Sequence, residues 1–360
     1  MVYYIITLPV TIIFLVCGVG FLFYAIKLRE KFPKEHNFYN SFLAFILWIL
    51  AGLVYPLFFW IDNSNIIFFL QLSMFFICLF TPSLIFLILF YQYLFVVKKN
   101  PEIKTTRNID NFLINLDKKK NRINDSRSYD LKTDLHRKAL HLFGAGMIII
   151  LWIFAVYIWE DLWKANEIWG ISGKYFARFL VLTAGYSSIL IFGALDFVRL
   201  SFIFENRSIY HLIPDKVLNL LCRSMKRKEK FDFIKPVILL LSFVPIFFFP
   251  FGVFAAAALI ATIGDGAASV FGLRFGKIHI PKTSDKTLIG YIGGFLTSFG
   301  ISILIFSLFE FNLGIYKILV IAFSGAIIFL IIDLLNLKID DNILNPILCA
   351  VVMGILYFLL

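Results

Sequence analysis

Long apolar runs separated by short polar segments dominate this chain. The runs cover residues 3–26, 40–61, 64–97, 139–159, 175–198, 236–250, 252–273, 287–309, 315–336 and 343–360. Most of them reach the length of about 20 residues that a helix needs to cross the hydrocarbon core of a bilayer. Because lipid offers no partner for an open strand edge, each run is expected to be helical. The pattern therefore predicts an all-α fold, a polytopic membrane helical bundle with about ten transmembrane helices.

Two of the runs depart from the simple pattern. Residues 64–97 are too many for one perpendicular crossing, and they contain Pro82 near the middle. We predict a single kinked or protruding helix here, with two half-helices as the alternative. The run 236–250 is short, and the Phe-Pro-Phe-Gly turn signal at residues 249–252 separates it from the next run.

Loop charge gives an independent test of the number of crossings. Segment 98–138 holds twelve Lys or Arg against six acids, and segment 201–235 holds eight against four. Segment 160–174 instead holds three acids against two lysines. With ten crossings, the basic loops all fall on one side, which the positive-inside rule assigns to the cytoplasm, and both termini lie outside. Two crossings within 64–97 would break this alternation.

Composition narrows the class of protein. The chain is 60% hydrophobic, and the basic loops account for its formal net charge of +11, so we expect no nucleic-acid partner. The four cysteines have no Cys-x-x-Cys spacing, which argues against a zinc site or a disulfide framework. We expect an integral membrane protein, in the plasma membrane of a prokaryote or the endoplasmic reticulum of a eukaryote. The sequence does not indicate the oligomeric state.

The polar segment 98–138 sets the expected domain organisation. It shows little periodicity and is typical of a basic, largely flexible cytoplasmic linker. It separates an N-terminal three-helix membrane segment, 1–97, from a seven-helix core, 139–360. Within the later basic segment, residues 217–225 place four apolar side chains on one helical face, which is typical of a helix lying on the inner leaflet.

Polar and charged residues gather where several runs meet the predicted cytoplasmic side. They are Arg137, Lys138 and His141; Asp196 and Arg199; Gly264, Asp265 and Gly266; Arg274, Lys277, Lys282 and Lys286; and Asp333, Asp340, Asp341 and Asn342. An ionised carboxylate at membrane depth is costly, so Asp265 is a functional candidate. Carboxylates hold divalent metals, while Lys and Arg neutralise phosphate oxygens. The set predicts a site for a metal-bound polyphosphate at the cytoplasmic face.

Each of these groups also has a simpler explanation. The basic residues can be positive-inside anchors, and Asp196 and Arg199, three residues apart, can neutralise each other. The glycines beside Asp265 can serve close helix packing, and Asp340 can cap the last helix. The gathering of carboxylates and cations on one side is what favours a functional site.

The same residues resemble the motifs of the CTP-dependent polyprenol and lipid-alcohol kinases, a family that includes dolichol kinase, phytol kinase and CTP-dependent diacylglycerol kinase. The matching positions are Arg137, Lys138 and His141; Asp196 and Arg199; Asp265, Ala267, Ala268, Gly272, Phe275, Gly276 and Lys277; and Asp333, Asp340, Asp341, Asn342 and Pro346. The resemblance covers about residues 137–360, and the blocks follow the family order. One block departs from the family, because Ile289 and Tyr291 stand where it usually has Glu and Ser.

The resemblance implies a kinase that transfers the γ-phosphoryl group of CTP to a long-chain isoprenoid alcohol, dolichol or polyprenol, at the cytoplasmic face. It implies that His141 and Asp265 are catalytic, and that Asp265, Asp340 and Asp341 hold a divalent metal, Mg²⁺ or Ca²⁺. The nucleotide phosphates are expected on Arg137, Lys138, Arg199, Gly264, Gly266, Lys277, Lys282 and Lys286.

Other functions stay open. The acceptor can instead be diacylglycerol or phytol. A phosphatidate-type cytidylyltransferase is a further alternative, although the chain lacks the polar signature of that family. A non-catalytic lipid-binding protein, suggested by Ile289, and a transporter complete the set.

Overall fold

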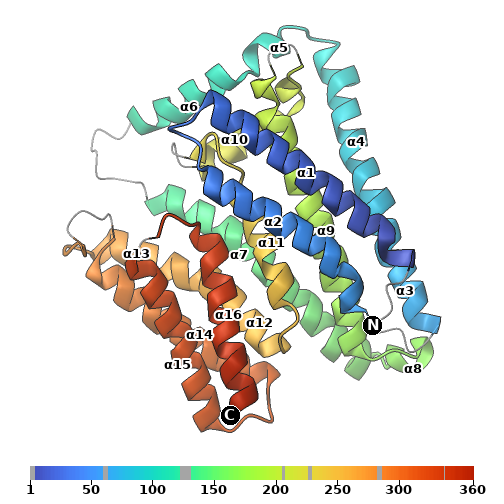
Figure 1. Ribbon diagram of the computed structural model, residues 1–360, viewed down its shortest axis with the longest axis vertical. Coiled ribbons are helices and arrows are strands. Elements are labelled where there is room, and N and C mark those ends of the chain that lie inside the picture. The colour runs from blue at the N-terminus through green and yellow to red at the C-terminus, as the bar shows by residue number, and fades with distance from the viewer. Residues whose placement is uncertain are drawn as a thin grey trace. The chain divides into compact units, whose positions relative to one another are not determined.

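The computed structural model describes residues 5–59, 64–121, 131–204, 207–225, 229–281, 286–335 and 337–360. Within these ranges the chain is largely helical, and strand pairing is limited to an isolated bridge between His279 and Thr287. Nine helices of the described chain are long and apolar enough to cross a membrane. The predicted all-α, polytopic membrane bundle is therefore confirmed (Figure 1).

The crossing segments are built from one or two main helices, some of them extended by a 3₁₀ or π turn. The main helices are α1 (Leu8–Lys31), α2 (Phe38–Val54), α3 (Ser64–Met74), α4 (Thr81–Tyr91), α7 (Leu131–Ile153), α9 (Gly173–Leu200), α12 (Phe251–Leu259), α13 (Asp265–Phe275), α14 (Leu288–Phe309), α15 (Ile315–Leu335) and α16 (Asp341–Leu359). The shorter helices are α5 (Ile103–Thr106), α6 (Ile109–Asn121), α8 (Ala165–Trp169), α10 (Asp215–Ser224) and α11 (Lys235–Ile246).

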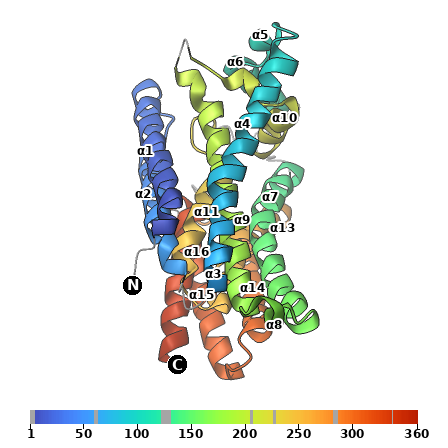
Figure 2. The same cartoon turned by 90° about the vertical axis from the view of Figure 1, so that its right-hand side faces the viewer.

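One helix of 34 residues covers Ser64–Val97. Its halves α3 and α4 are joined by the π-helical segment Phe75–Phe80, which directly precedes the turn that contains Pro82. Figure 2 shows α3 continuing into α4. At 1.5 Å per residue this helix is about 51 Å long, against a hydrocarbon core of about 30 Å. The prediction of a single long helix is confirmed.

The chain divides into two compact units. Unit 1 comprises Met1–Asp125 and Ile148–Val237, and unit 2 comprises Ser126–Met147 and Ile238–Leu360. These bounds differ from the predicted domain boundaries, because α9 groups with the N-terminal helices. Polar contacts explain part of this grouping: the Thr183 hydroxyl donates to Ser73 Oγ at 2.7 Å, and the Tyr186 hydroxyl donates to the Ala51 carbonyl at 2.7 Å.

The segment predicted to be a flexible linker contains helical structure. α5 and α6 form within it, and Arg107 between them donates to both carboxylate oxygens of Asp215 on α10, at 2.5 and 2.7 Å. The same guanidinium donates to Gln92 Oε1 at 3.1 Å. These bonds tie the start of α6 to the rest of unit 1. The helix also buries Phe112 and Leu116, which are four residues apart and lie on one face. This short apolar stripe is a signal that the polar composition of the segment obscured.

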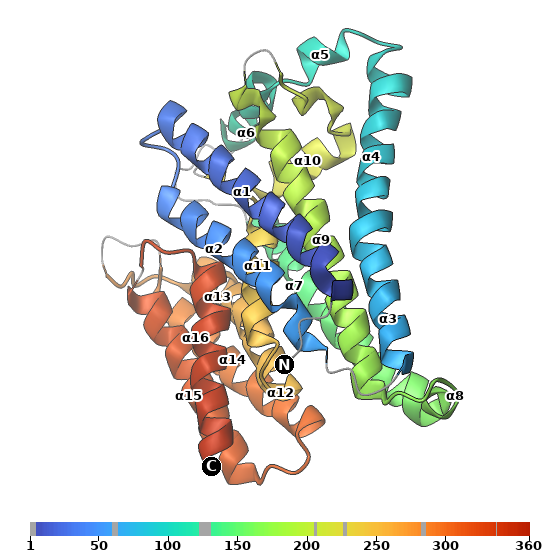
Figure 3. The same ribbon diagram turned by 45° about the vertical axis from the view of Figure 1, so that its right-hand side comes forward.

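Aromatic packing holds the first helices of unit 1 together. Figure 3 shows α1 and α2 lying side by side. Between them the Phe14 and Trp48 rings are 5.1 Å apart, and Tyr186 of α9 lies 4.7 Å from Phe14. All three side chains are buried. Offset aromatic pairs of this kind add to the free energy gained by burying their area.

Unit 2 is a series of neighbouring helices packed through small residues. α13 packs on α14, α14 on α15, and α15 on α16. A Cβ atom added to Gly290 would lie 2.8 Å from the Ala268 carbonyl oxygen and 3.3 Å from the Gly272 Cα atom. A Cβ atom added to Gly294 would lie 2.8 Å from the Ala268 Cβ atom. Small residues let helix backbones approach closely in membranes, so this seam sets the distance between α13 and α14.

The short helix α11 completes the chain path. Within unit 2, Asp134 contacts Ser269 and Lys138 contacts Asp265, so α7 and α13 run antiparallel. α11 precedes α12 in the chain, and its 12 residues extend about 18 Å. Residues 237–244 of α11 are all buried, which suits a short helix enclosed by protein. α11 is shorter than the nine candidate crossings of the described chain, so the ten passes expected from the sequence stay a prediction.

Candidate functional site

Asp265 lies directly after a π-helical turn. The turn covers Ile260–Gly264 and joins α12, whose residues are all buried, to α13. π-Helical turns inside α-helices occur frequently at functional sites. Here the turn brings Asp265 to the first position of α13, ten residues before that helix ends at Phe275.

The first ion pair of the site joins α7 to α13. The Lys138 ammonium donates to the Asp265 carboxylate, with 11% and 20% of the two side chains exposed. One turn earlier on α7, buried Asp134 accepts from Arg137 Nη2 at 3.0 Å and from Ser269 Oγ at 2.5 Å. Together these contacts form a polar network between two helices that are distant in the sequence.

The second ion pair joins the start of α14 to the end of α15. Lys286 donates to Asp333 Oδ1 at 2.5 Å and to the Asp333 carbonyl at 3.0 Å. The backbone around Lys286 is held by bonds from Ile280 N to the Lys286 carbonyl and from Leu288 N to the Ile278 carbonyl. Burial disfavours the ammonium, but the Asp333 carboxylate outweighs burial, and the pKa of Lys286 is raised. Lys286 is therefore a fixed cation at this end of unit 2.

The two ion pairs belong to one electrostatic cluster. Asp333 lies within electrostatic range of Asp265 and Asp341, and Lys286 within range of Asp341. His141 lies within range of Asp265 and Asp341 as well as of the basic residues on its own helix. Four helices of unit 2, α7, α13, α15 and α16, thus contribute to the cluster. Of the acids and bases that the sequence singled out, the structure brings together Lys138, His141, Asp265, Lys286, Asp333 and Asp341.

His141 occupies a buried position in this cluster. The residue is 6% exposed, and its Nδ1 atom has no hydrogen-bond partner among the described residues. An unpartnered nitrogen on a buried imidazole can accept a proton or a hydrogen bond from a ligand. This geometry suits the role of general base that the sequence suggested for His141.

The carboxylates suit a metal that arrives with a substrate. Mg²⁺ is commonly held by one or two carboxylates together with phosphates and water. In the described part of the chain, no group of three or more His, Cys, Asp or Glu side chains is placed to hold a metal ion. The separate carboxylates of Asp265 and Asp341 fit a metal–nucleotide complex better than a metal bound by protein alone.

Some of the predicted site residues have structural contacts. Asp340 Oδ1 accepts from the Asn342 backbone N–H at 3.0 Å, so Asp340 caps α16. A Cβ atom on Gly264 would lie 2.3 Å from Ser298 Oγ, so this glycine permits close packing on α14. A Cβ atom on Gly266 would meet only Lys138 atoms, at 3.8 Å or more. Packing therefore explains Gly264 but not Gly266.

Arg199 is part of the scaffold of unit 1. Its guanidinium pairs with Asp196 at 2.8 Å and donates to the carbonyl oxygens of Lys230, at 2.9 Å, and Asp232. Both members of the pair are almost fully buried. Because these contacts occupy most of its N–H groups, we leave Arg199 out of the phosphate-binding set.

The last turn of α13 and the loop after it contribute exposed cations. Arg274 and Lys277 are both exposed, and Arg274 lies 5.3 Å from the centre of the Phe275 ring. Lys282, which the sequence also assigned to phosphate binding, lies outside the described residues. Exposed cations are suited to meeting the phosphates of a soluble nucleotide.

Sequence reasoning missed the buried contact between Asp134 and Ser269. Asp134 precedes Arg137 by three residues and Lys138 by four, and Ser269 follows Asp265 by four. Residues at these spacings share a helical face. That signal was present, but Asp134 was placed in the flexible linker, because the predicted run began at residue 139 whereas α7 begins at Leu131.

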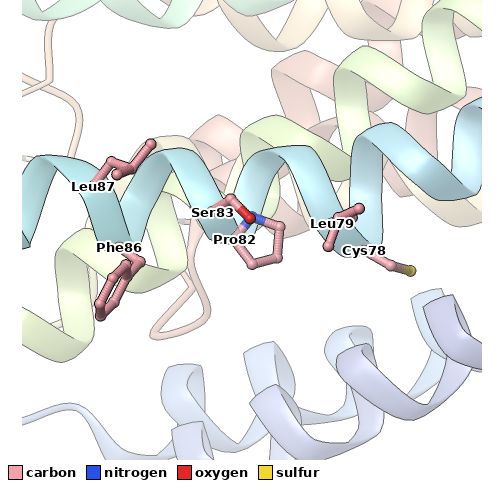
Figure 4. Close-up of a pocket in the computed structure, with 6 residues that line it drawn as sticks. All are labelled: Cys78, Leu79, Pro82, Ser83, Phe86 and Leu87. Atoms are coloured by element: carbon pink, nitrogen blue, oxygen red, sulfur yellow. The ribbon is translucent and has the colours of Figure 1, made fainter.

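A groove in unit 1 has no part in this chemistry. It has a volume of about 450 Å³, and it is lined by Cys78, Leu79, Pro82, Ser83, Phe86 and Leu87 (Figure 4). All of these residues belong to the single helix α3–α4. The lining contains no carboxylate, amine, guanidinium or imidazole, so the groove is apolar helix surface rather than a catalytic cleft.

Comparison of the chain with protein-family models, with curated proteins and with solved structures finds no match in any of the three. The resemblance to lipid-alcohol kinases is therefore a hypothesis carried by the individual motifs. The geometry of the site in unit 2 is the evidence by which this hypothesis is judged.

Proposed function

We propose that the protein is a membrane kinase that transfers the γ-phosphoryl group of CTP to the hydroxyl of a long-chain isoprenoid alcohol. The observation that carries the proposal is the cluster in unit 2, where His141 lies within electrostatic range of Lys138, Asp265 and Asp341. The Lys286–Asp333 pair also lies within electrostatic range of Asp341. Phosphoryl transfer needs positioning and charge neutralisation, and it needs little covalent chemistry from the protein. Carboxylates for a metal and lysines for phosphates are the groups that it uses.

In the proposed reaction, the oxygen of the lipid alcohol bonds to the γ-phosphorus, and the bond between that phosphorus and the β–γ bridging oxygen breaks. CDP leaves with the electron pair of the broken bond. The hydroxyl proton passes to His141 Nδ1, or to Asp265 if the carboxylate is the nearer base. A divalent metal, when bound, would neutralise phosphate charge. Lys138, Lys286 and Lys277 would hold the nucleotide phosphates.

The membrane setting favours a lipid acceptor. The cluster is built on helices of a polytopic bundle, and these helices present apolar side chains elsewhere, such as Leu348 and Ile355 of α16. A lipid alcohol can diffuse laterally to such a site, while the nucleotide meets the exposed basic loop. Because that loop is positively charged, we propose that the site faces the cytoplasm.

The decisive experiment uses membranes that contain the overexpressed protein. With γ-labelled CTP and Mg²⁺, label should enter a polyprenol or related isoprenoid alcohol, and a chelator should stop the transfer. Asp265→Asn membranes with matched protein content are the control. Label from α-labelled CTP in the lipid would instead indicate cytidylyl transfer, and γ-label on diacylglycerol alone would change the acceptor. No lipid label from CTP or ATP, with folded protein, would reject the kinase and favour a non-catalytic lipid-binding protein.

A further inference from the structure

Asn345 is a buried polar residue with no role in the site described so far. It lies in the second turn of α16 and is 3% exposed, and its Oδ1 atom has no hydrogen-bond partner among the described residues. A buried amide oxygen without a partner destabilises the fold by about 1–3 kcal/mol. Such an atom is more easily understood if a ligand supplies the missing donor.

A second acceptor lies on the same turn of the helix. Residue 346 is proline, which has no backbone N–H, so the carbonyl of Asn342 loses the donor that an α-helix would give it. Asn342 is itself buried. The first two turns of α16 therefore present two buried acceptor oxygens.

Asn345 lies one helical turn from Asp341, a member of the carboxylate cluster. Asn345 follows Asp341 by four residues, so the two side chains lie on one face of α16, one turn apart. Four residues further on, the Cys349 thiol contacts the Gly325 carbonyl of α15 at 3.5 Å, so this face looks into unit 2. His141, whose Nδ1 atom also has no partner among the described residues, lies within electrostatic range of Asp341.

The chemistry of these atoms selects a ligand class. Neutral acceptor oxygens call for a hydrogen-bond donor, and a hydroxyl group supplies one without adding charge. The side of α16 next to Asn345 is apolar and exposed at Leu348, Val351 and Ile355. A ligand with a hydroxyl end and a long hydrocarbon tail matches both features.

We propose that Asn345 binds the hydroxyl group of a long-chain lipid alcohol, which donates a hydrogen bond to Asn345 Oδ1. This inference rests on the proposed function, since the bound alcohol would be the phosphoryl acceptor. It adds a binding residue that selects an alcohol over a lipid without a hydroxyl donor.

The test measures binding without any nucleotide. Purified full-length protein in detergent is titrated with a C20 isoprenoid alcohol, and in parallel with its methyl ether, while the thermal unfolding midpoint is recorded. The alcohol should stabilise the parent, and the ether, which lacks the donor, should do so more weakly. Asn345→Leu should weaken the apparent affinity for the alcohol by about 5–10-fold, the loss expected for one neutral hydrogen bond.

Matched variants separate binding from folding. Asn345→Leu without ligand should be at least as stable as the parent, because it removes a buried unpaired oxygen. Asn345→Ala provides a smaller replacement if leucine does not fit. Ser302→Ala is the control, since the buried Ser302 hydroxyl already bonds to the Ser298 carbonyl at 2.8 Å. That variant should bind the alcohol as the parent does.

The outcomes distinguish this inference from the proposed function. Equal alcohol affinity in the parent and both Asn345 variants would overturn the inference even if CTP-dependent phosphorylation were observed. Equal stabilisation of the parent by alcohol and ether would overturn it as well. If the binding depends on Asn345 but no phosphoryl transfer occurs, the hydroxyl site stands and the kinase proposal fails.

Discussion

Lys138 of α7 and Asp265 of α13 form an ion pair within unit 2, although 127 positions separate them in the sequence. Both side chains are largely buried. Breaking such a pair by removing one partner leaves an uncompensated charge. The pair therefore links the stability of unit 2 to the proposed chemistry.

The first prediction concerns activity. Asp265→Asn should lower lipid phosphorylation by ~10³-fold or more, because a group that stabilises charge in the transition state is lost. The variant should still insert, because the apolar runs that direct insertion are unchanged. Initial rates with γ-labelled CTP, normalised to inserted protein, measure this. Activity within tenfold of the parent would contradict the proposed role of Asp265.

The second prediction concerns the pair itself. Lys138→Met should destabilise the protein by about 1–3 kcal/mol, less than for a fully buried pair because both groups keep some exposure. Adding Asp265→Asn should recover most of this loss, since no charge is then left unpaired. Thermal unfolding of the two single variants and the double variant gives the coupling free energy between Lys138 and Asp265. Additive effects would mean that the contact contributes little.

The third prediction tests the small-residue seam. Gly290→Ala should be strongly destabilising, because its Cβ atom would lie 2.8 Å from the Ala268 carbonyl oxygen. Gly300→Ala on the same helix is the control, since its Cβ atom meets nothing within 4 Å. We expect that variant to be as stable as the parent or more stable, because alanine favours a helix over glycine. Equal unfolding temperatures for both variants would argue against close packing at Gly290.

The fourth prediction concerns acid stability. Burial alone would raise the pKa of Asp232, but hydrogen bonds from His36 and the Asn37 backbone N–H outweigh it, and the pKa is lowered. The ionised group therefore stabilises the fold above its unfolded pKa of about 3.9. That contribution is lost as pH falls through the lower folded value. Asp232→Asn should flatten the pH dependence of the unfolding temperature in this acid range, whereas Glu30→Gln, at an exposed pair, should not.

The fifth prediction concerns Glu310, which joins three helices of unit 2. Its carboxylate accepts from the Gly252 backbone N–H at 2.9 Å and from the Tyr357 hydroxyl at 2.8 Å. Glu310→Gln should cost about 1–2 kcal/mol, because it removes an anion from the N-terminus of α12 and one acceptor oxygen. Tyr357→Phe should cost less, since it removes only one bond. A lower unfolding temperature for Tyr357→Phe than for Glu310→Gln would refute the role given to Glu310.

The sequence alone determined that this is a membrane protein built of helices. In lipid, each backbone N–H and C=O must find its partner within its own helix, so a run of about 20 apolar residues suffices to predict a crossing. For residues 64–97 the rule left two half-helices open, and the loop charges favoured the one long helix that the structure contains. The exception is α11, whose 12 residues are too few for such a crossing although residues 237–244 are buried.

The tertiary structure alone decided how the charged residues are used. The sequence placed Asp265, Asp340, Arg199 and Lys138 in one set, but it could not say which would meet. In the folded protein Lys138 pairs with Asp265, and Asp340 caps α16. Arg199 pairs with Asp196 inside unit 1. The reason is physical: an ion pair forms only where two helices approach closely. Lys138 and Asp265 are 127 positions apart in the sequence, so a local pattern of charges does not reveal that their helices approach.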